Sequence, residues 1–248
     1  MLKKVKNEIL FTKSKKILRG SMKQIFCAIF LIINGLHIKA QTIQQAYWFR
    51  LYTRVTLSDK LTGQIETDYR RFINPDRAWQ SYSQARLHYR FHKNWETVLG
   101  LGYAVVWQGD LPVPEWRPYQ DGQYFQPLSK GWQVAFRVRV EERFIHNASK
   151  TELTDGFGFR LRPRMRVQLT KVFNAKWAAR LSEELLIHAD EGFNQNQVWL
   201  SLERQLNHGF SIDLGYMKAI VKRNPEGYFD RDNLRLSLVK NISLERTK

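Results

Sequence analysis

Apolar and polar residues alternate with a period of two through nearly all of the chain after residue 46. The clearest stretch is 132–145, whose two faces carry Trp132, Val134, Phe136, Val138 and Val140 against Gln133, Arg137, Arg139, Glu141 and Arg143. Successive side chains of a β-strand point to opposite faces, so this period is the repeat of a strand. No sustained 3.6-residue helical period occurs in the same region. The pattern predicts an all-β fold.

Eleven such segments, each about 11–14 residues long, are expected near 47–57, 61–73, 79–91, 95–107, 117–128, 132–145, 157–169, 177–188, 193–206, 210–221 and 233–244. Ordinary strands average about 5–6 residues, whereas a strand that crosses a membrane at a tilt needs about 9–11 residues in the hydrocarbon. Short turns are expected at 58–60, 92–94, 129–131 and 207–209, and mostly longer connections at 74–78, 108–116, 146–155, 189–192 and 223–232. Together these features predict an up-and-down antiparallel transmembrane β-barrel of about 10–12 strands.

The spacing of aromatic residues indicates which face meets lipid. Trp95 and Trp107 lie twelve residues apart on the apolar face of one predicted strand, and the strands over 79–91 and 132–145 repeat that separation. Twelve residues of tilted strand cover a height of roughly 30 Å, which matches two aromatic girdles around an apolar band of about 25 Å. We expect an interfacial girdle that contains Trp79, Trp95, Trp107, Trp132 and Phe144.

The polar face then lines the lumen. We expect a lumen network of ion pairs and hydrogen bonds made by Glu66, Asp68, Arg70, Arg137, Arg139, Glu141, Arg143, Arg160, Arg162, Arg164, Arg166 and Glu184. Such charges need partners, because an uncompensated buried charge costs several kcal/mol. The same residues are also consistent with an anion-attracting constriction, since arginines outnumber carboxylates. Strict alternation sends Glu183 to the lipid side, and we expect a bulge beside Glu184 to turn it away.

The segment before the barrel is typical of an export signal. The apolar run 25–36 is shorter than the ~20 residues that span a bilayer as a helix. Met22 and Lys23 precede it, and Ala40 followed by Gln41 provides a small residue at a cleavage site. We expect residues 1–40 to be a leader and cleaved signal peptide, with Met22 as an alternative start and a membrane anchor as the alternative interpretation. Residues 41–248 are expected to form one barrel domain in the outer membrane of a Gram-negative bacterium.

Much of the formal net charge of +17 belongs to this leader, so charge alone gives little support to nucleic-acid binding. The one cysteine, Cys27, lies within the leader and excludes a disulfide framework.

The predicted barrel carries an ordered set of motifs over about residues 46–244. They are Trp48, Leu57-Ser58-Asp59-Lys60, Glu66, Arg70-Arg71-Phe72, Trp95, Gly100, Gly102, Tyr103, Glu115-Trp116-Arg117-Pro118-Tyr119-Gln120, the arginine-rich 137–143 and 160–164, Glu183-Glu184-Leu185, 194–197 and Gly215-Tyr216. In this order the motifs resemble those of the DUF2490 family, bacterial outer-membrane proteins common in Bacteroidetes and named as a domain of unknown function. The resemblance covers essentially the whole predicted barrel. It implies an outer-membrane β-barrel. It brings no activity and no functional residues.

No catalytic, metal or cofactor site is predicted. His88, His92, His146, His188 and His208 fall on different predicted strands or turns, without metal-ligand spacing. No nucleophile elbow, P-loop or dinucleotide fingerprint occurs. The histidine nearest to Ser83 on the apolar wall faces the other way, so no lipid-facing Ser–His pair is found.

The stretch 115–120, which follows Pro112 and Pro114, is interpreted as a rim loop stiffened by proline. Ligand contact through Trp116 and Tyr119 is the alternative interpretation.

The sequence therefore predicts an outer-membrane barrel that is structural or a narrow polar pore with a lumen lined by Arg and Glu. The expected partners are outer-membrane lipid and unidentified envelope proteins, with no nucleic acid. Two alternatives stay open: an outer-membrane enzyme that modifies lipid or lipopolysaccharide, and a secreted soluble β-barrel that binds a polar ligand.

Overall fold

The computed structural model describes residues 43–223 and 227–244. The chain divides into two compact units, Met1–Lys39 and Ala40–Lys248, and the described residues belong to the second. The predicted leader over 1–40 lies outside the described residues.

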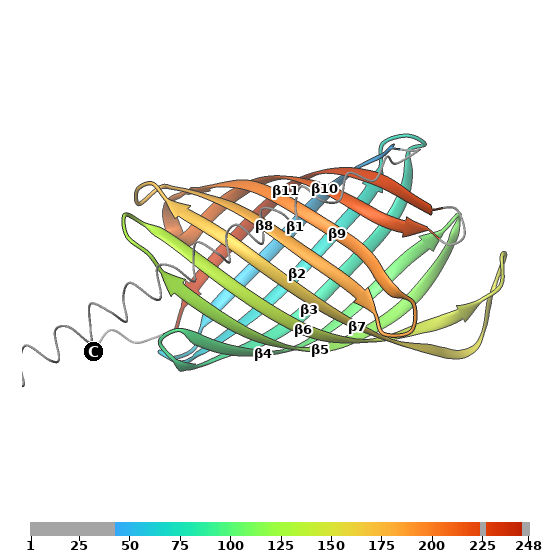
Figure 1. Cartoon of the computed structure of the whole chain (residues 1–248), viewed down its shortest axis with the longest axis horizontal. Helices are drawn as coiled ribbons and strands as arrows, with labels where there is room; N and C mark the ends of the chain where they lie inside the picture. The colour runs from blue at the N-terminus through green and yellow to red at the C-terminus, as the bar shows by residue number, and fades with distance from the viewer. Residues whose placement is uncertain (1–42, 224–226, 245–248) are drawn as a thin grey trace, which may run out of the picture. The chain divides into compact units, whose positions relative to one another are not determined.

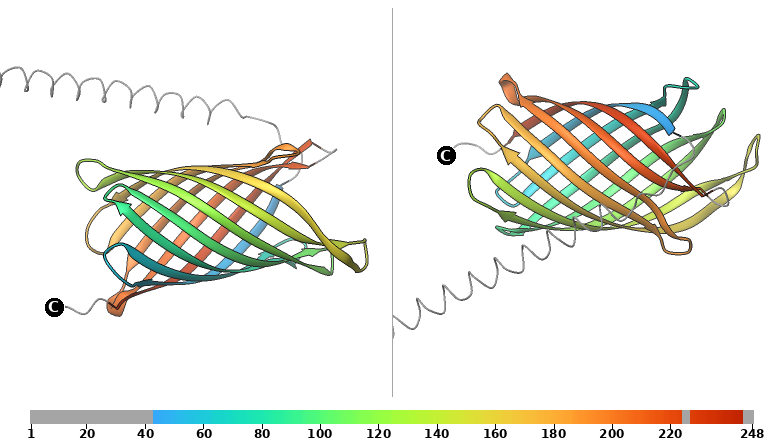
Figure 2. Two further views of the ribbon diagram at one scale, coloured as in Figure 1. Left: turned by 90° about the horizontal axis from the view of Figure 1, so that it is seen from below. Right: turned by 45° about the horizontal axis from the view of Figure 1, so that its top comes forward.

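The described residues form eleven strands that close into one barrel (Figure 1). The strands are β1 (Ile43–Thr56), β2 (Leu61–Phe72), β3 (Arg77–His92), β4 (Trp95–Gln108), β5 (Leu111–Pro127), β6 (Trp132–Ala148), β7 (Leu153–Val172), β8 (Trp177–His188), β9 (Gly192–Gln205), β10 (Phe210–Arg223) and β11 (Gly227–Ser243), with a short 3₁₀ helix, η1 (Asn207–Gly209), before β10. Each strand pairs with its neighbours in sequence, and all run obliquely around the barrel (Figure 2). The all-β class and the strand number agree with the prediction.

The barrel closes through a parallel seam between β1 and β11, which corrects the expectation of a purely antiparallel sheet. The seam runs in regular register from the pair Ile43↔Asp230 to the pair Thr56↔Ser243. In an up-and-down barrel with an odd number of strands, the first and last strands run in the same direction, so their pairing is parallel. Side chains reinforce the seam: Arg50 Nε donates to Ser237 Oγ at 3.1 Å.

The connections gather at two rims. The first rim holds 57–60, 93–94, 128–131, 173–176 and 206–209, and the second rim holds 73–76, 109–110, 149–152 and 189–191. The described connections are short at both rims, so the prediction of longer loops at one rim is wrong. β5 begins at Leu111, within the segment 108–116 that is predicted as a connection. Its prolines Pro112 and Pro114 come before the first pair of the β5–β6 ladder, Glu115↔Ile145. A proline is tolerated there because its missing N–H breaks no bond of that ladder.

The β6–β7 hairpin extends beyond its neighbours at the second rim (Figure 1). The β7–β8 ladder begins only at the pair Arg164↔Leu186, so residues 153–159 pair with β6 alone and are exposed. This hairpin occupies the segment 146–155 that the sequence pattern predicts as a loop.

The outer wall is apolar. Leu99 is 60% exposed, Leu214 is 58% exposed, and Leu200, Leu234 and Val138 are similarly exposed. Their neighbours in each strand point inward and are mostly polar and buried, among them Arg137, Arg139 and Asp213. The barrel therefore has the reverse of a soluble protein's distribution, with its polar groups inside.

Candidate functional site: a charged lumen

One cavity of about 940 Å³ occupies the lumen and is lined from both rims. Lys93 and Pro127 line it near the first rim, and Trp79, Val106 and Asn194 near the second. Fourteen arginines and Lys93 line it against seven carboxylates: Arg50, Arg54, Arg70, Arg86, Arg90, Arg117, Arg137, Arg139, Arg143, Arg162, Arg164, Arg166, Arg180 and Arg235, with Glu66, Asp68, Glu96, Glu141, Glu184, Glu203 and Asp213. The lining carries a clear excess of positive charge.

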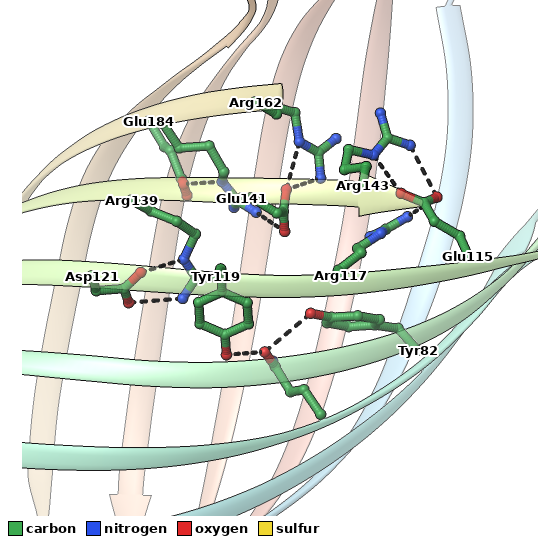
Figure 3. Close-up of polar contacts among 12 residues, drawn as sticks. Tyr82, Glu115, Arg117, Tyr119, Asp121, Arg139, Glu141, Arg143, Arg162 and Glu184 are labelled. Carbon is green, nitrogen blue, oxygen red and sulfur yellow. Dashed lines mark hydrogen bonds and ion pairs between the residues drawn. The ribbon is translucent and has the colours of Figure 1, made fainter. Parts of the chain in front are cut away.

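One part of the network links β5, β6, β7 and β8, and Figure 3 shows its residues. Arg139 donates to both oxygens of Asp121, Nε at 2.6 Å and Nη2 at 2.8 Å. Glu141 accepts from Arg162 Nε at 2.6 Å. These groups are almost fully buried, and the charge-assisted bonds within each pair offset part of the cost of removing the charges from water.

Two further carboxylates each hold two arginines. Glu184 Oε1 accepts from Arg137 Nη2 at 2.5 Å and from Arg164 Nε at 2.6 Å. Toward the second rim, Glu115 accepts from Arg117 Nη2 at 2.8 Å, and Arg143 donates to both of its oxygens (Figure 3). A carboxylate that binds two guanidiniums forms a group with a net positive charge, so these pairings do not make the lumen neutral.

The network continues around the β1–β4 side of the lumen. Asp68 accepts from Arg70 Nε and Nη2, each at 2.8 Å. Glu66 pairs with Arg86, and its other oxygen lies 3.7 Å from Arg50 Nη1.

Toward the first rim, Glu96 Oε1 lies 2.7 Å from His88 Nδ1, and Arg90 Nη2 donates to Glu96 Oε2 at 3.1 Å. On the opposite side, Asp213 accepts from Arg235 Nη2 at 3.0 Å, and Glu203 pairs with Arg180. Charged pairs therefore surround the lumen at several heights.

Two tyrosines fill the lumen beside β4. Tyr119 and Tyr82 both donate from their hydroxyls to Gln84 Oε1, at 2.6 and 3.2 Å (Figure 3). Gly100 and Gly102 face them, and a Cβ added at either glycine would collide with the tyrosine ring opposite. The glycines thus provide the space that these rings occupy.

An aromatic cluster lies inside the barrel and was not predicted as such. Trp48 contacts Trp199 and Trp79, with ring centroids 5.1 and 5.7 Å apart, and Met217 packs against the same group. The guanidinium of Arg70 lies 3.8 Å from the ring centroid of Trp48. Stacking on an aromatic ring shields part of an arginine while its N–H groups still face the lumen.

The placement of Trp79 corrects its assignment to the outer girdle. Arg70 pairs with Gln80 and Arg71 with Ala78, so Trp79 is the extra residue of a β-bulge. A bulge re-aims its extra side chain, and Trp79 lines the cavity.

The other four predicted girdle residues lie on the outer face. Trp95 and Trp132 are exposed near the first rim and Phe144 near the second. Trp107 is half-buried. It lies four residues after the exposed Tyr103, so the two side chains are on the same face of β4. Cations accompany the aromatic residues near the first rim, as in the pairs Lys171–Trp132, Arg204–Trp177 and Lys240–Phe210.

Of the predicted lumen network, Arg160 and Arg166 lie apart from the buried ion pairs. Arg160 pairs with Glu191 at 3.0 Å, and both side chains are 41% exposed. Arg166 lines the cavity without an ion pair to any described carboxylate. The predicted network lacks Arg117 and Asp121: Arg117 stands in the stretch 115–120 that is interpreted as a rim loop, and Asp121 stands in the predicted strand 117–128 without being assigned to the lumen. Their parity with Tyr119 would have placed them in the lumen once that stretch is recognised as strand.

Glu183 keeps the outward position that alternation gives it, so the bulge expected beside Glu184 is wrong. The irregularity of β8 lies between Leu186 and Ile187. Glu183 Oε1 instead accepts from Asn196 Nδ2 at 3.0 Å, from the neighbouring strand.

The described residues contain no group of three or more His, Cys, Asp or Glu side chains that could hold a metal ion. Ser83 Oγ lies 3.1 Å from Thr67 Oγ1 on the outer face. None of the helices in residues 43–223 and 227–244 is long and apolar enough to cross a membrane.

A family model described as "Protein of unknown function (DUF2490)" matches residues 45–230. The chain belongs to this family. Its Bacteroidetes source stays a prediction. No curated protein matches this DUF2490 chain.

Two solved structures are similar to this chain. The structure of the NanC porin is 12% identical with a TM-score of 0.51, and the match covers 77% of this chain and 94% of that one. The β domain of the Bordetella autotransporter Brka is 14% identical with a TM-score of 0.41, over 72% of this chain and 79% of that one. The likeness to NanC shows a common closed-barrel fold.

Proposed function

We propose that this DUF2490 protein is an outer-membrane barrel whose lumen is a narrow, anion-selective channel. The observation that carries the proposal is the lumen cavity, lined from both rims and rich in arginine, inside an apolar wall. Export through a cleaved signal peptide over 1–40 and contact with outer-membrane lipid are parts of the same proposal.

The outer wall supports the membrane setting. A contiguous apolar surface of this extent is unfavourable in water and suits lipid tails. A closed barrel also pairs its backbone groups between strands, as the hydrocarbon requires. The lysines and arginines that stack on aromatic rings near the first rim lie where a headgroup layer would meet the barrel.

The lumen supports anion selectivity and a small bore. Fixed guanidinium groups in excess of carboxylates raise the local concentration of anions. The cavity of about 940 Å³ is lined by long arginine, tyrosine and tryptophan side chains that reach in from around the barrel. Such a lining suits small hydrated ions better than large solutes.

Recording in planar bilayers under a KCl gradient tests the proposal. The reversal potential is expected to approach that of chloride. Arg54→Glu reverses a charge near the first rim that bonds only Tyr52 and leaves the buried pairs intact, so it should reduce the anion preference. Lys150→Glu makes the same charge change in the hairpin turn, outside the cavity lining, and should leave the preference unchanged. A folded, inserted barrel that stays silent would contradict the channel.

A structural barrel is the second candidate. The buried ion pairs that join β6 to β8 and β6 to β5 favour it. It predicts a folded, membrane-inserted protein with no conductance. The enzyme alternative predicts turnover of labelled phospholipid or lipopolysaccharide, and a blank assay would remove it.

A further inference from the structure

The lumen-facing residues of β6 and β7 oppose one another in four directly paired rows. The rows are Arg143↔Arg160, Glu141↔Arg162, Arg139↔Arg164 and Arg137↔Arg166. Three of the four rows place two arginines opposite each other, an arrangement that destabilises a sheet unless something compensates the charge.

Carboxylates compensate the first three rows. Glu191 pairs with Arg160 at the second rim, and Asp121 takes both bonds of Arg139. Glu141 binds Arg162 and has its other oxygen 3.6 Å from Arg164 Nη1.

The fourth row, Arg137 and Arg166, depends on Glu184 alone. This carboxylate is the register partner of Arg166 on β8, yet its bonds go to Arg137 and Arg164. Three guanidiniums therefore surround one carboxylate.

Both arginines of the fourth row line the cavity, and both keep N–H donors without a partner among the described residues. Arg166 makes no hydrogen bond or ion pair with the described residues, and it lines the cavity. Arg137 is 7% exposed, and its Nε is buried without a partner. Gln168 and Ser182, the next paired residues toward the first rim, also line the cavity and offer neutral donors.

We propose that Arg137 and Arg166 form a binding site for a small oxyanion, of the class of sulfate, phosphate or a simple carboxylate. Two guanidinium groups present several N–H donors in fixed planes, which suits an oxyanion better than chloride. The inference deepens the proposed channel function and rests on it for the route by which the anion arrives.

Isothermal titration of the folded barrel in a neutral detergent, with sulfate as the probe, tests the site without requiring conduction. Arg166→Gln should weaken sulfate binding about tenfold, as expected for the loss of one charge-assisted contact. Arg160→Gln removes the same charge from the same strand, at a pair outside the cavity lining, and should change the affinity less than about twofold. Arg166→Lys should give an intermediate affinity, because it keeps the charge and loses the planar fork.

Equal sulfate affinities in wild-type and Arg166→Gln barrels, or equal losses in the Arg166→Gln and Arg160→Gln variants, would overturn the site. Folding of each variant is checked by heat-modifiable gel mobility. If a variant does not fold, the wild-type barrel decides: sulfate must raise its melting temperature more than chloride at equal ionic strength. A silent bilayer with sulfate binding intact would contradict the channel alone, whereas an anion-selective current with no sulfate binding would contradict this site alone.

Discussion

Arg139 and Asp121 form a two-bond ion pair on the inner face of the barrel, with Nε and Nη2 of the arginine 2.6 and 2.8 Å from the two carboxylate oxygens. The guanidinium also lies 3.7 Å from the ring centroid of Tyr119. The pair bridges β5 and β6 and is almost completely buried.

Asp121→Asn should therefore destabilise the barrel strongly. It leaves the buried Arg139 charge without its carboxylate, at a cost of about 3–5 kcal/mol. The free energy of unfolding in urea, measured from lipid vesicles, checks this. The double variant Asp121→Leu with Arg139→Met removes both charges and should recover most of the loss. A single variant within about 0.5 kcal/mol of wild type would show that the pair contributes little to stability.

Gly100→Ala should also destabilise the barrel, for a steric reason. The new Cβ would collide with the ring of Tyr119 and displace its hydroxyl from Gln84. Overpacking of this kind costs about 1–3 kcal/mol. Gly122→Ala is the matched control, because nothing lies within 4 Å of the added carbon. The same urea titration compares them, and equal effects at the two glycines would refute the packing account.

Trp199→Ala should widen the lumen. Trp199 packs against Trp48, lies 4.3 Å from the guanidinium carbon of Arg235, and lines the cavity. Its removal should raise the single-channel conductance and lower stability by about 3–5 kcal/mol. Trp132→Ala removes an indole from the outer face and should leave the conductance unchanged. A conductance that responds equally to both changes would argue against an aromatic constriction.

Leu99→Arg tests whether lipid covers the outer wall. Leu99 lies on the outer face of β4 and is 60% exposed. An arginine near the bilayer midplane of a barrel costs about 2–4 kcal/mol. Thr62→Arg places the same side chain in the cavity near the first rim, where it stays hydrated, and should cost less. Unfolding from vesicles measures both, and a Leu99→Arg variant as stable as Thr62→Arg would mean that lipid does not cover this face.

Alternation and segment length were sufficient to predict the all-β class and the strand number. They also gave the face on which most residues lie, since Arg137, Arg139 and Glu141 line the cavity while Val138 and Leu99 point outward. Parity would also have placed Trp48 and Trp199 inside, because each shares a face with polar lumen residues of its own strand.

Other features depend on relations between strands that one segment does not show. Trp79 turns inward because the β2–β3 register shifts by one residue. The start of β5 at Leu111 was obscured by Pro112 and Pro114, which read as loop residues in isolation. The unmatched charge of Arg166 emerges only when the partners of Glu184 on β6 and β7 are known.

The central claim is that the outer wall lies in lipid while the lumen is open to water and small ions, and cysteine accessibility in vesicles tests it most directly. Residues 43–248 contain no cysteine, so Val138→Cys on the outer face and Gln123→Cys in the cavity lining can each be introduced alone. A charged, water-soluble thiol reagent should modify Gln123→Cys and leave Val138→Cys unreacted. A fluorophore on Val138→Cys should be quenched by brominated lipid tails. Rapid aqueous modification of Val138→Cys without lipid quenching, with Gln123→Cys unreactive, would contradict the account.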